Sequence, residues 1–375
     1  MAEAVTSLTM TTLALLVLAA SMSVIQGQKP VISPEVHGDK SITFRFVSPN
    51  AKAVTVGLEG NGNVTLTKND AGVWEGTSKP LRPDIYGYTF SVDGQATYDP
   101  LNPVIKVNMI YVGNMVTVHG TPPELWEVQN VPHGQLTEHF YKSGIIGDER
   151  NYLVYTPPGY IGGKGNLPVL YLLHGFSDMA NGWSIVGKAH VIMDNLIAQQ
   201  KIKPMMVVMT LGYGVPDFVT RGSNFRDPER TTKNFTLFRK ALIEEVMPMV
   251  EKNYRASKKQ SDHAIAGLSM GGAETLLTGL NNPDKFAYVG AFSSGGLPAG
   301  KPETFFANVN GESTKNTKVI WMSCGTGDGL IGFQRGFADW LTKRGVKVKT
   351  NETTGGHEWL LWRRNLAEFA QMIFK

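Results

Sequence analysis

The chain of 375 residues has little cysteine, little excess charge and no long apolar run. Cys324 is its single cysteine, so an intrachain disulfide is excluded and the core must be stable without one. The net charge is +4 and no lysine- and arginine-rich block occurs, which argues against nucleic acid as a partner. The sequence shows no metal-ligand spacing and no phosphate-binding glycine loop. We therefore expect neither a metal nor a cofactor.

The densest apolar run, residues 13–20, is too short to span a membrane. It lies in a stretch between Glu3 and Lys29 that has no charged residue, and small residues follow it. This pattern is typical of a signal peptide, although the first eight residues carry an acidic residue and no basic one. We expect residues 1–27 to be a signal peptide and the protein to be secreted or periplasmic, without a stable membrane partner. An uncleaved anchor is the alternative.

Two kinds of pattern divide the rest of the chain. Residues 30–120 contain short alternating segments such as 41–47, separated by Asn-Gly and Asp-Gly turns, which predicts a small immunoglobulin-like β-sandwich. Residues 121–134 are rich in proline and glycine and are predicted to be a linker. Residues 135–375 alternate strands with helices, and runs such as 169–173 are continuously apolar, as in a sheet buried on both faces. The predicted class is α/β, an α/β-hydrolase domain preceded by an all-β domain.

The most informative motif is Gly-Leu-Ser-Met-Gly at residues 267–271. An apolar run precedes it and a helix-forming run, residues 273–277, follows it. Strand, G-x-S-x-G and helix form the context of a nucleophile elbow, in which glycines permit a sharp turn that exposes the serine hydroxyl. G-x-S-x-G by itself is a weak signal, and the alternative is a tight glycine turn without a catalytic role. The flanking segments favour Ser269 as a nucleophile.

A serine hydroxyl needs a base that takes its proton and an acid that orients the base. Asp328 follows an apolar run, and His357 lies later on a glycine-rich loop before the last helical pattern. The order Ser, Asp, His is that of α/β-hydrolases. Glu358 and Asp284 are rival acids, but the first is adjacent to the base and the second lies in a helix-ending turn. We predict Ser269, Asp328 and His357 as the catalytic residues.

Two backbone amides are predicted to form an oxyanion hole. In this fold, one comes from the loop after the first buried strand and the other from the residue after the nucleophile. The first position is Phe176, in His174-Gly175-Phe176, and the second is Met270. Such donors stabilise the negative oxygen of a tetrahedral intermediate.

The predicted site carries no large cap domain, because the stretch from residue 295 to 317 is too short to hold one. An open site suits an ester attached to a polymer. Trp183, Tyr213 and Phe225 are candidates for a slot that binds an aromatic acyl group, and packing within loops is the alternative for each.

The hydrolase part resembles carbohydrate esterase family 1, which contains feruloyl esterases and acetyl xylan esterases. The matching segments are residues 150–160, 171–175, 266–272, 324–328 and 355–359. The resemblance implies a serine carboxylic ester hydrolase that acts through an acyl-enzyme and releases ferulate from arabinoxylan. Acetyl xylan esterase and enterochelin-type esterase are the alternatives. The implied partner is a plant cell-wall polysaccharide, feruloylated or acetylated xylan. A carbohydrate-binding protein with an inactive hydrolase domain is disfavoured by the complete triad.

The front segment resembles carbohydrate-binding module family 48 at residues 73–76 and 85–94. The alternative for its aromatic residues, Trp74, Tyr86 and Tyr88, is that they are core side chains. If this domain binds polymer, its deletion is expected to spare the turnover of soluble methyl ferulate. In that case the deletion is expected to weaken action on insoluble xylan. If the domain instead shapes the catalytic unit, turnover of methyl ferulate and action on xylan are expected to fall equally.

Overall fold

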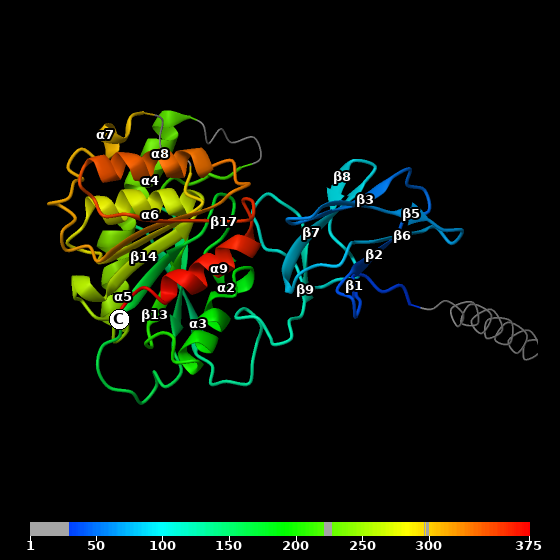
Figure 1. Cartoon of the computed structure of the whole chain (residues 1–375), viewed down its shortest axis with the longest axis horizontal. Coiled ribbons are helices and arrows are strands. Elements are labelled where there is room, and N and C mark those ends of the chain that lie inside the picture. Colours follow the sequence, from blue (N-terminus) through cyan, green and yellow to red (C-terminus); the bar gives the residue numbers. More distant parts are fainter. Residues whose placement is uncertain (1–29, 221–226, 296, 298–299) are drawn as a thin grey trace, which may run out of the picture.

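The computed structural model describes residues 30–220, 227–295, 297 and 300–375. Two bodies lie side by side, a front domain of strands and a larger domain of strands and helices (Figure 1). The predicted signal peptide, residues 1–27, lies outside the described residues. Within the described part of the chain, no helix is both long enough and apolar enough to cross a membrane.

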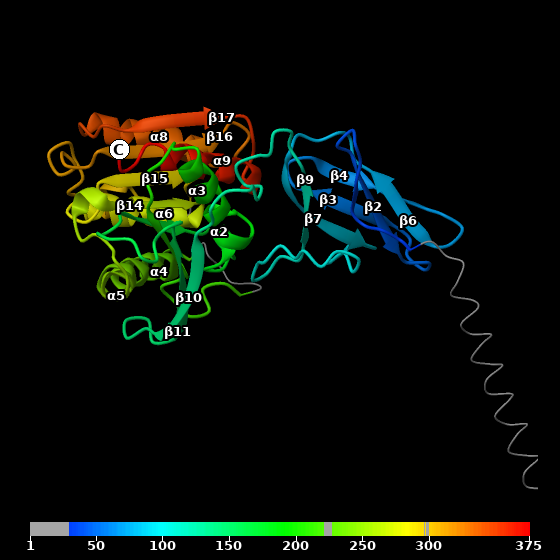
Figure 2. The same ribbon diagram turned by 90° about the horizontal axis from the view of Figure 1, so that it is seen from below.

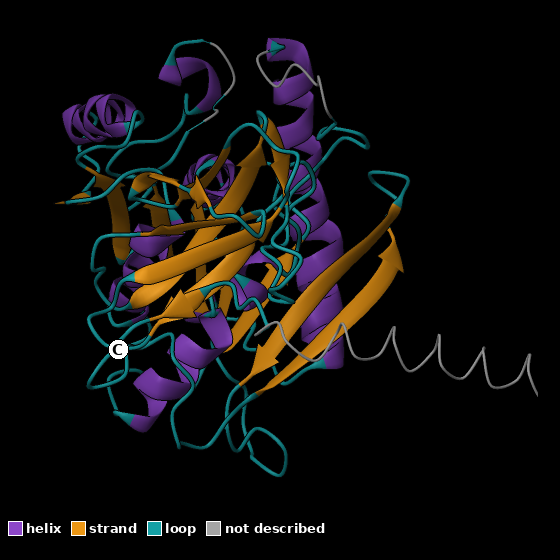
Figure 3. Cartoon of the chain, turned by 90° about the vertical axis from the view of Figure 1, so that its right-hand side faces the viewer, coloured by secondary structure: helices purple, strands orange, loops and turns teal. Residues whose placement is uncertain are grey.

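The front domain consists of two antiparallel sheets packed face to face. One sheet has the order β1 (Glu35–Val36), β2 (Ile42–Val47), β6 (Val73–Thr77), β5 (Thr67–Lys68). The other has the order β4 (Gly62–Thr65), β3 (Val54–Leu58), β7 (Asp84–Val92), β8 (Gln95–Thr97), and β9 (Asn114–Val118) also pairs with β7. Strands and loops make up the whole of this domain as described, and it faces the viewer in Figure 3.

The alternating apolar residues of these strands meet between the two sheets. Phe44 and Phe90 are fully buried there, with their rings in edge contact. Trp74, Tyr86 and Tyr88 belong to the same core. These three aromatic residues, which lie in the segments that resemble carbohydrate-binding module family 48, are therefore core side chains and offer no exposed ring to a sugar.

The larger domain contains an eight-stranded mixed sheet of the α/β-hydrolase type. Its order is β10 (Gln135–Lys142), β11 (Glu149–Thr156), β13 (Met206–Thr210), β12 (Val169–Leu173), β14 (His263–Leu268), β15 (Tyr288–Phe292), β16 (Val319–Gly325), β17 (Lys349–Thr353). β11 runs antiparallel to both its neighbours, and the strands from β13 to β17 are parallel. The carboxyl ends of the parallel strands therefore share one edge, where sites form in such sheets.

Helices cover both faces of this sheet. Successive side chains of β12 point to opposite faces, so Tyr171 belongs to one core and Leu172 to the other. The first core is closed by α4 (Pro228–Ala241), α5 (Met247–Asn253), α6 (Met270–Asn281) and α8 (Ile331–Lys343). The second is closed by α2 (Gly182–Ile185), α3 (Ala189–Ala198) and α9 (Trp359–Ala370). A short helix, α7 (Pro302–Phe305), precedes β16.

Local hydrogen bonds set several element boundaries. α4 begins at Pro228, because Asp227 accepts the amides of Glu229 and Arg230 as an N-cap. A π-helical turn, η1 (Leu242–Val246), joins α4 to α5, and a 3-10 turn, η2 (Gln260–Asp262), precedes β14. Both refinements depend on local hydrogen bonding that hydrophobic periodicity does not report.

The segment 121–134, predicted as a linker, is packed against the hydrolase domain. Trp126 is 4% exposed and belongs to the core beneath α3 and α9. Asn195 on α3 donates to the carbonyls of Leu125 and Glu127. Its irregular backbone is thus held in place by side-chain hydrogen bonds.

Candidate active site

Ser269 occupies the sharp turn between β14 and α6, with φ at +52°. A non-glycine residue in that region is strained, and the surroundings hold it there. Its amide donates to Phe292 O at 2.9 Å, and Gly295 N donates to its carbonyl at 3.1 Å. A Cβ on Gly271 would clash with the carbonyl of His174. The second glycine of the motif therefore lets the nucleophile turn press directly against the loop after β12.

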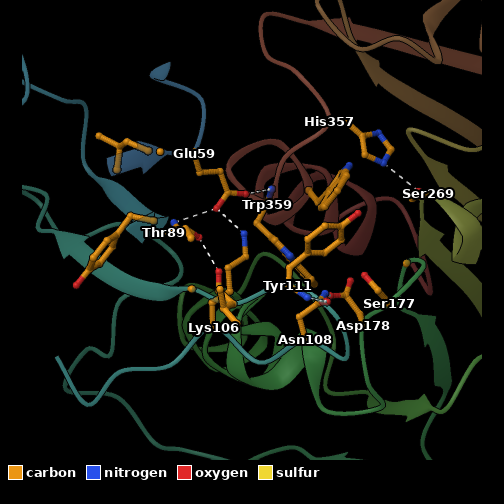
Figure 4. Close-up of a pocket in the computed structure, with 18 of the residues that line it drawn as sticks. Glu59, Thr89, Lys106, Asn108, Tyr111, Ser177, Asp178, Ser269, His357 and Trp359 are labelled. Atoms are coloured by element: carbon orange, nitrogen blue, oxygen red, sulfur yellow. Dashed lines mark hydrogen bonds and ion pairs between the residues drawn. The ribbon is translucent and has the colours of Figure 1, made fainter. Parts of the chain in front are cut away.

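The structure brings the three predicted catalytic side chains into one hydrogen-bonded line. Figure 4 shows the contact between His357 and Ser269. His357 Nε2 lies 2.9 Å from Ser269 Oγ, and His357 Nδ1 lies 2.9 Å from Asp328 Oδ2. The imidazole is 38% exposed, whereas the Asp328 side chain is 1% exposed. The base is thus open to a substrate while the acid is shielded from water.

Asp328 keeps its charge although it is buried. Burial disfavours the carboxylate, but hydrogen bonds from His357 and from Leu330 N outweigh it and lower the pKa of Asp328. The two rival acids are elsewhere: Glu358 accepts from Gly356 N, and Asp284 pairs with its neighbour Lys285. Asp328 is the acid that the fold places against the base.

The loop after β12 contacts the nucleophile turn. Phe176 lines the cavity beside Ser269, and Met270 is the first residue of α6. The backbone amides of these two residues remain our prediction for the oxyanion hole. His174 itself has a supporting position: its Nε2 accepts from Gly212 N at 2.9 Å. Burial lowers the pKa of His174 to about 4, so this imidazole is neutral.

A cavity of about 510 Å³ opens in front of Ser269 and His357, and it lies between the two domains. The hydrolase domain supplies Gly175 to Asp178, Leu268, Ser269, His357, Trp359 and Trp362. The front domain supplies the opposite wall, with Leu58, Glu59, Thr89, Lys106, Asn108 and Tyr111 among its lining residues. Tyr111 is 65% exposed, so its ring is accessible. The sequence did not predict that the front domain lines the cavity, because no motif marks these residues.

The predicted aromatic slot is not where the sequence placed it. Trp183 is fully buried, donates to Leu173 O at 2.8 Å and packs against Trp359. Tyr213 is 5% exposed, and its hydroxyl donates to the carbonyl of Asp178 at 2.7 Å. Both are held in the core by their own hydrogen bonds and do not line the cavity, so the prediction that they contact substrate is wrong. Phe225 lies outside the described residues.

The sheet, the elbow and the serine–histidine–aspartate line define the class of the molecule as an α/β-hydrolase. The family model Esterase, described as "Putative esterase", matches residues 143–372. The chain belongs to this family.

Relatives in sequence agree with that assignment. The chain is 33% identical over 356 residues to an endo-1,4-beta-xylanase/feruloyl esterase of Xylanibacter ruminicola; the match covers 91% of this chain and 46% of that protein. The chain thus spans about half the length of this curated relative. It is 25% identical to an acetyl esterase of Caldicellulosiruptor saccharolyticus, over 56% of this chain and 84% of that protein.

Two solved structures share the fold at lower identity. A ferulic acid esterase from Anaeromyces mucronatus matches with a TM-score of 0.57 and 24% identity, over 66% of this chain and 93% of its own. An enterochelin esterase from Shigella flexneri matches with a TM-score of 0.68 and 18% identity, over 90% of this chain and 94% of its own. The second match is long enough to include part of the front domain.

Proposed function

We propose that the protein is a serine carboxylic ester hydrolase, a feruloyl esterase that releases ferulate from arabinoxylan. The observation that carries this proposal is the Ser269–His357–Asp328 line at the floor of a cavity of about 510 Å³. Such a volume suits an aromatic acyl group with its sugar, since pockets for drug-sized ligands begin near 300 Å³. The likeness to a relative named xylanase/feruloyl esterase, over 91% of this chain, supports the same substrate class.

The reaction follows from the geometry. Ser269 Oγ attacks the ester carbonyl while His357 Nε2 takes its proton, and Asp328 stabilises the imidazolium without taking the proton itself. The amides of Phe176 and Met270 stabilise the oxyanion. As the intermediate collapses and the bond between the acyl carbon and the sugar oxygen breaks, the protonated His357 gives its proton to that oxygen, which leaves as a hydroxyl. Water, activated by the same imidazole, releases ferulate from the acyl-enzyme.

We also propose that residues 1–27 direct the chain out of the cytoplasm and that residues 30–120 form a domain like carbohydrate-binding module family 48. The paired antiparallel sheets support the second point. Because Trp74, Tyr86 and Tyr88 are buried in its core, any contact with polysaccharide comes from other side chains.

A substrate panel tests the proposal: methyl ferulate, acetylated xylan and a catecholate siderophore, each with wild type and Ser269→Ala. We expect the highest kcat/KM on methyl ferulate. Faster turnover of acetylated xylan would favour acetyl xylan esterase, which the similarity to an acetyl esterase supports. Faster turnover of the siderophore would favour the enterochelin-type alternative.

A further inference from the structure

The front domain binds the segment that directly follows the catalytic histidine. Glu59, just after β3, accepts the amide of Trp359 through Oε1 at 2.9 Å (Figure 4). Trp359 is the first residue of α9, and the preceding Glu358 makes no side-chain cap. The next residue, Leu360, is 1% exposed and belongs to the hydrophobic core of the sandwich. His357 therefore lies two residues before a helical turn that the other domain holds.

Glu59 is itself fixed and charged. Its Oε2 accepts from Lys106 Nζ and from Gly87 N, each at 2.9 Å, and its side chain is 12% exposed. Burial disfavours the carboxylate, but the charges of Lys106 and Arg363 and the hydrogen bonds outweigh it and lower the pKa of Glu59. A negative charge against the first amide of a helix is stabilising, because the helix dipole is positive at that end.

The same domain also contacts the predicted oxyanion loop. Met109 N donates to Ser177 O at 2.8 Å, and Asn108 Nδ2 donates to Asp178 Oδ1 at 3.0 Å. Ser177 has φ at +68°, so its backbone conformation needs support from its surroundings. The front domain thus hydrogen-bonds to both segments beside Ser269, the one after His357 and the loop at residues 177–178. The ion pair between Glu59 and Lys106 connects these two sets of contacts.

We propose that the front domain is a positioning part of the catalytic centre and that Glu59 is the residue through which it holds His357 in line with Ser269 and Asp328. This inference rests on the proposed function. It differs from a polymer-binding role, because a displaced imidazole slows the hydrolysis of every ester, including small soluble ones.

The test compares Glu59→Ala with Glu75→Ala on methyl ferulate. Glu75 pairs with Arg45 on the surface of the same domain and does not line the cavity, so it is the matched control. Active sites are titrated with a fluorophosphonate, so that kcat refers to folded enzyme. We expect Glu59→Ala to lower kcat by about 10- to 100-fold with KM within about 2-fold, the size of effect that a misplacement of about 1 Å produces. Equal kcat in Glu59→Ala and Glu75→Ala would overturn the inference.

Two further variants distinguish a role of Glu59 in positioning His357 from a role only in holding the two domains together. Glu59→Gln retains one acceptor of the same reach for the Trp359 amide but loses the acceptor toward Lys106 and Gly87, so it is expected to recover part of the kcat lost in Glu59→Ala. Glu59→Asp retains the charge but is one methylene shorter, so its kcat is expected to fall. If Glu59→Ala does not fold, wild-type kcat in Glu59→Asp would overturn the inference.

A spectroscopic readout is independent of turnover. The proton between His357 Nδ1 and Asp328 is expected as a low-field ¹H resonance in wild type and in Glu75→Ala, and as a broadened or absent one in Glu59→Ala. An unchanged resonance in Glu59→Ala would count against the inference. A wild type that shows this resonance yet hydrolyses no ester would overturn the proposed function instead.

Discussion

Arg363 on α9 reaches across to Asp84 at the start of β7, and both side chains are completely excluded from solvent. Arg363 Nη2 lies 2.8 Å from Asp84 Oδ1, and its Nη1 donates to Val186 O at 3.0 Å. Arg364 pairs with the other oxygen of Asp84 at 2.6 Å. The views in Figures 1 and 2 both show α9 on the side of the hydrolase domain that faces the sandwich. One buried carboxylate thus holds two adjacent cations of the last helix.

Removal of this carboxylate is expected to destabilise the protein strongly. In Asp84→Ala the guanidinium of Arg363 stays buried without its counter-charge, which typically costs about 3–5 kcal/mol. The control is Glu352→Ala, which breaks the surface pair with Arg335 and is expected to leave the unfolding midpoint nearly unchanged, because solvent screens exposed ion pairs. Urea unfolding measures both changes. Similar midpoints for the two variants would refute the expected difference.

Substitution of the nucleophile is expected to abolish turnover and leave the fold intact. Ser269→Ala removes the attacking oxygen, and loss of such a group typically lowers kcat by about 10⁴- to 10⁶-fold. Initial rates on methyl ferulate, with circular dichroism as the control for folding, measure the effect. Retention of more than about a tenth of wild-type kcat would exclude Ser269 as the nucleophile.

The acid is tested by a pair of isosteric substitutions. Asp328→Asn is expected to lower kcat by about 10⁴-fold with little effect on KM, because the amide favours the wrong imidazole tautomer. Glu358→Gln is the matched control, since that side chain accepts from Gly356 N and not from His357. Steady-state kinetics measure kcat and KM for both variants. A large loss of kcat in Glu358→Gln and a small one in Asp328→Asn would identify Glu358 as the acid.

Asp178 makes the stability of the protein depend on pH. Burial raises the pKa of this carboxyl to about 7, against an opposing effect of Lys106. A raised folded-state pKa gives a contribution that is complete below the usual value near 4 and is lost as pH rises through about 7. For a shift of about three pKa units the loss is at most about 4 kcal/mol. Wild type is thus expected to lose stability relative to Asp178→Asn between pH 4 and 8 in thermal unfolding. Parallel curves would contradict this.

Tyr111 is expected to favour aromatic acyl or sugar groups over small ones. This residue is 65% exposed, and it lines the cavity opposite the hydrolase domain. Burial of about 40 Å² of apolar surface against it contributes about 1 kcal/mol at 25 cal/mol per Å². Tyr111→Ala should lower kcat/KM on methyl ferulate about 5-fold and leave p-nitrophenyl acetate nearly unchanged. Equal losses of kcat/KM on both esters would show that Tyr111 does not discriminate between aromatic and small acyl groups.

The elbow and the order of the catalytic residues could be read from sequence because their signals are local. Glycines that permit a sharp turn lie within two residues of Ser269, and the flanking strand and helix show their own periodicities. Asp328 and His357 follow recognisable strand ends, and parallel strands bring such ends to one edge of a sheet. The α/β pattern of residues 135–375 was readable for the same reason, since a doubly covered strand is apolar throughout.

The second wall of the site was decided only by the tertiary structure. Glu59 and Trp359 are 300 residues apart, and no local pattern in the sequence links them. The position of an aromatic residue in the sequence does not tell which way its side chain points, so the sequence could not place Trp183 and Tyr213. The fold turns both side chains into the core, where backbone carbonyls accept their polar hydrogens. Local patterning reports periodicity and turn chemistry, whereas the docking of two domains depends on the complementarity of surfaces that exist only once each domain has folded.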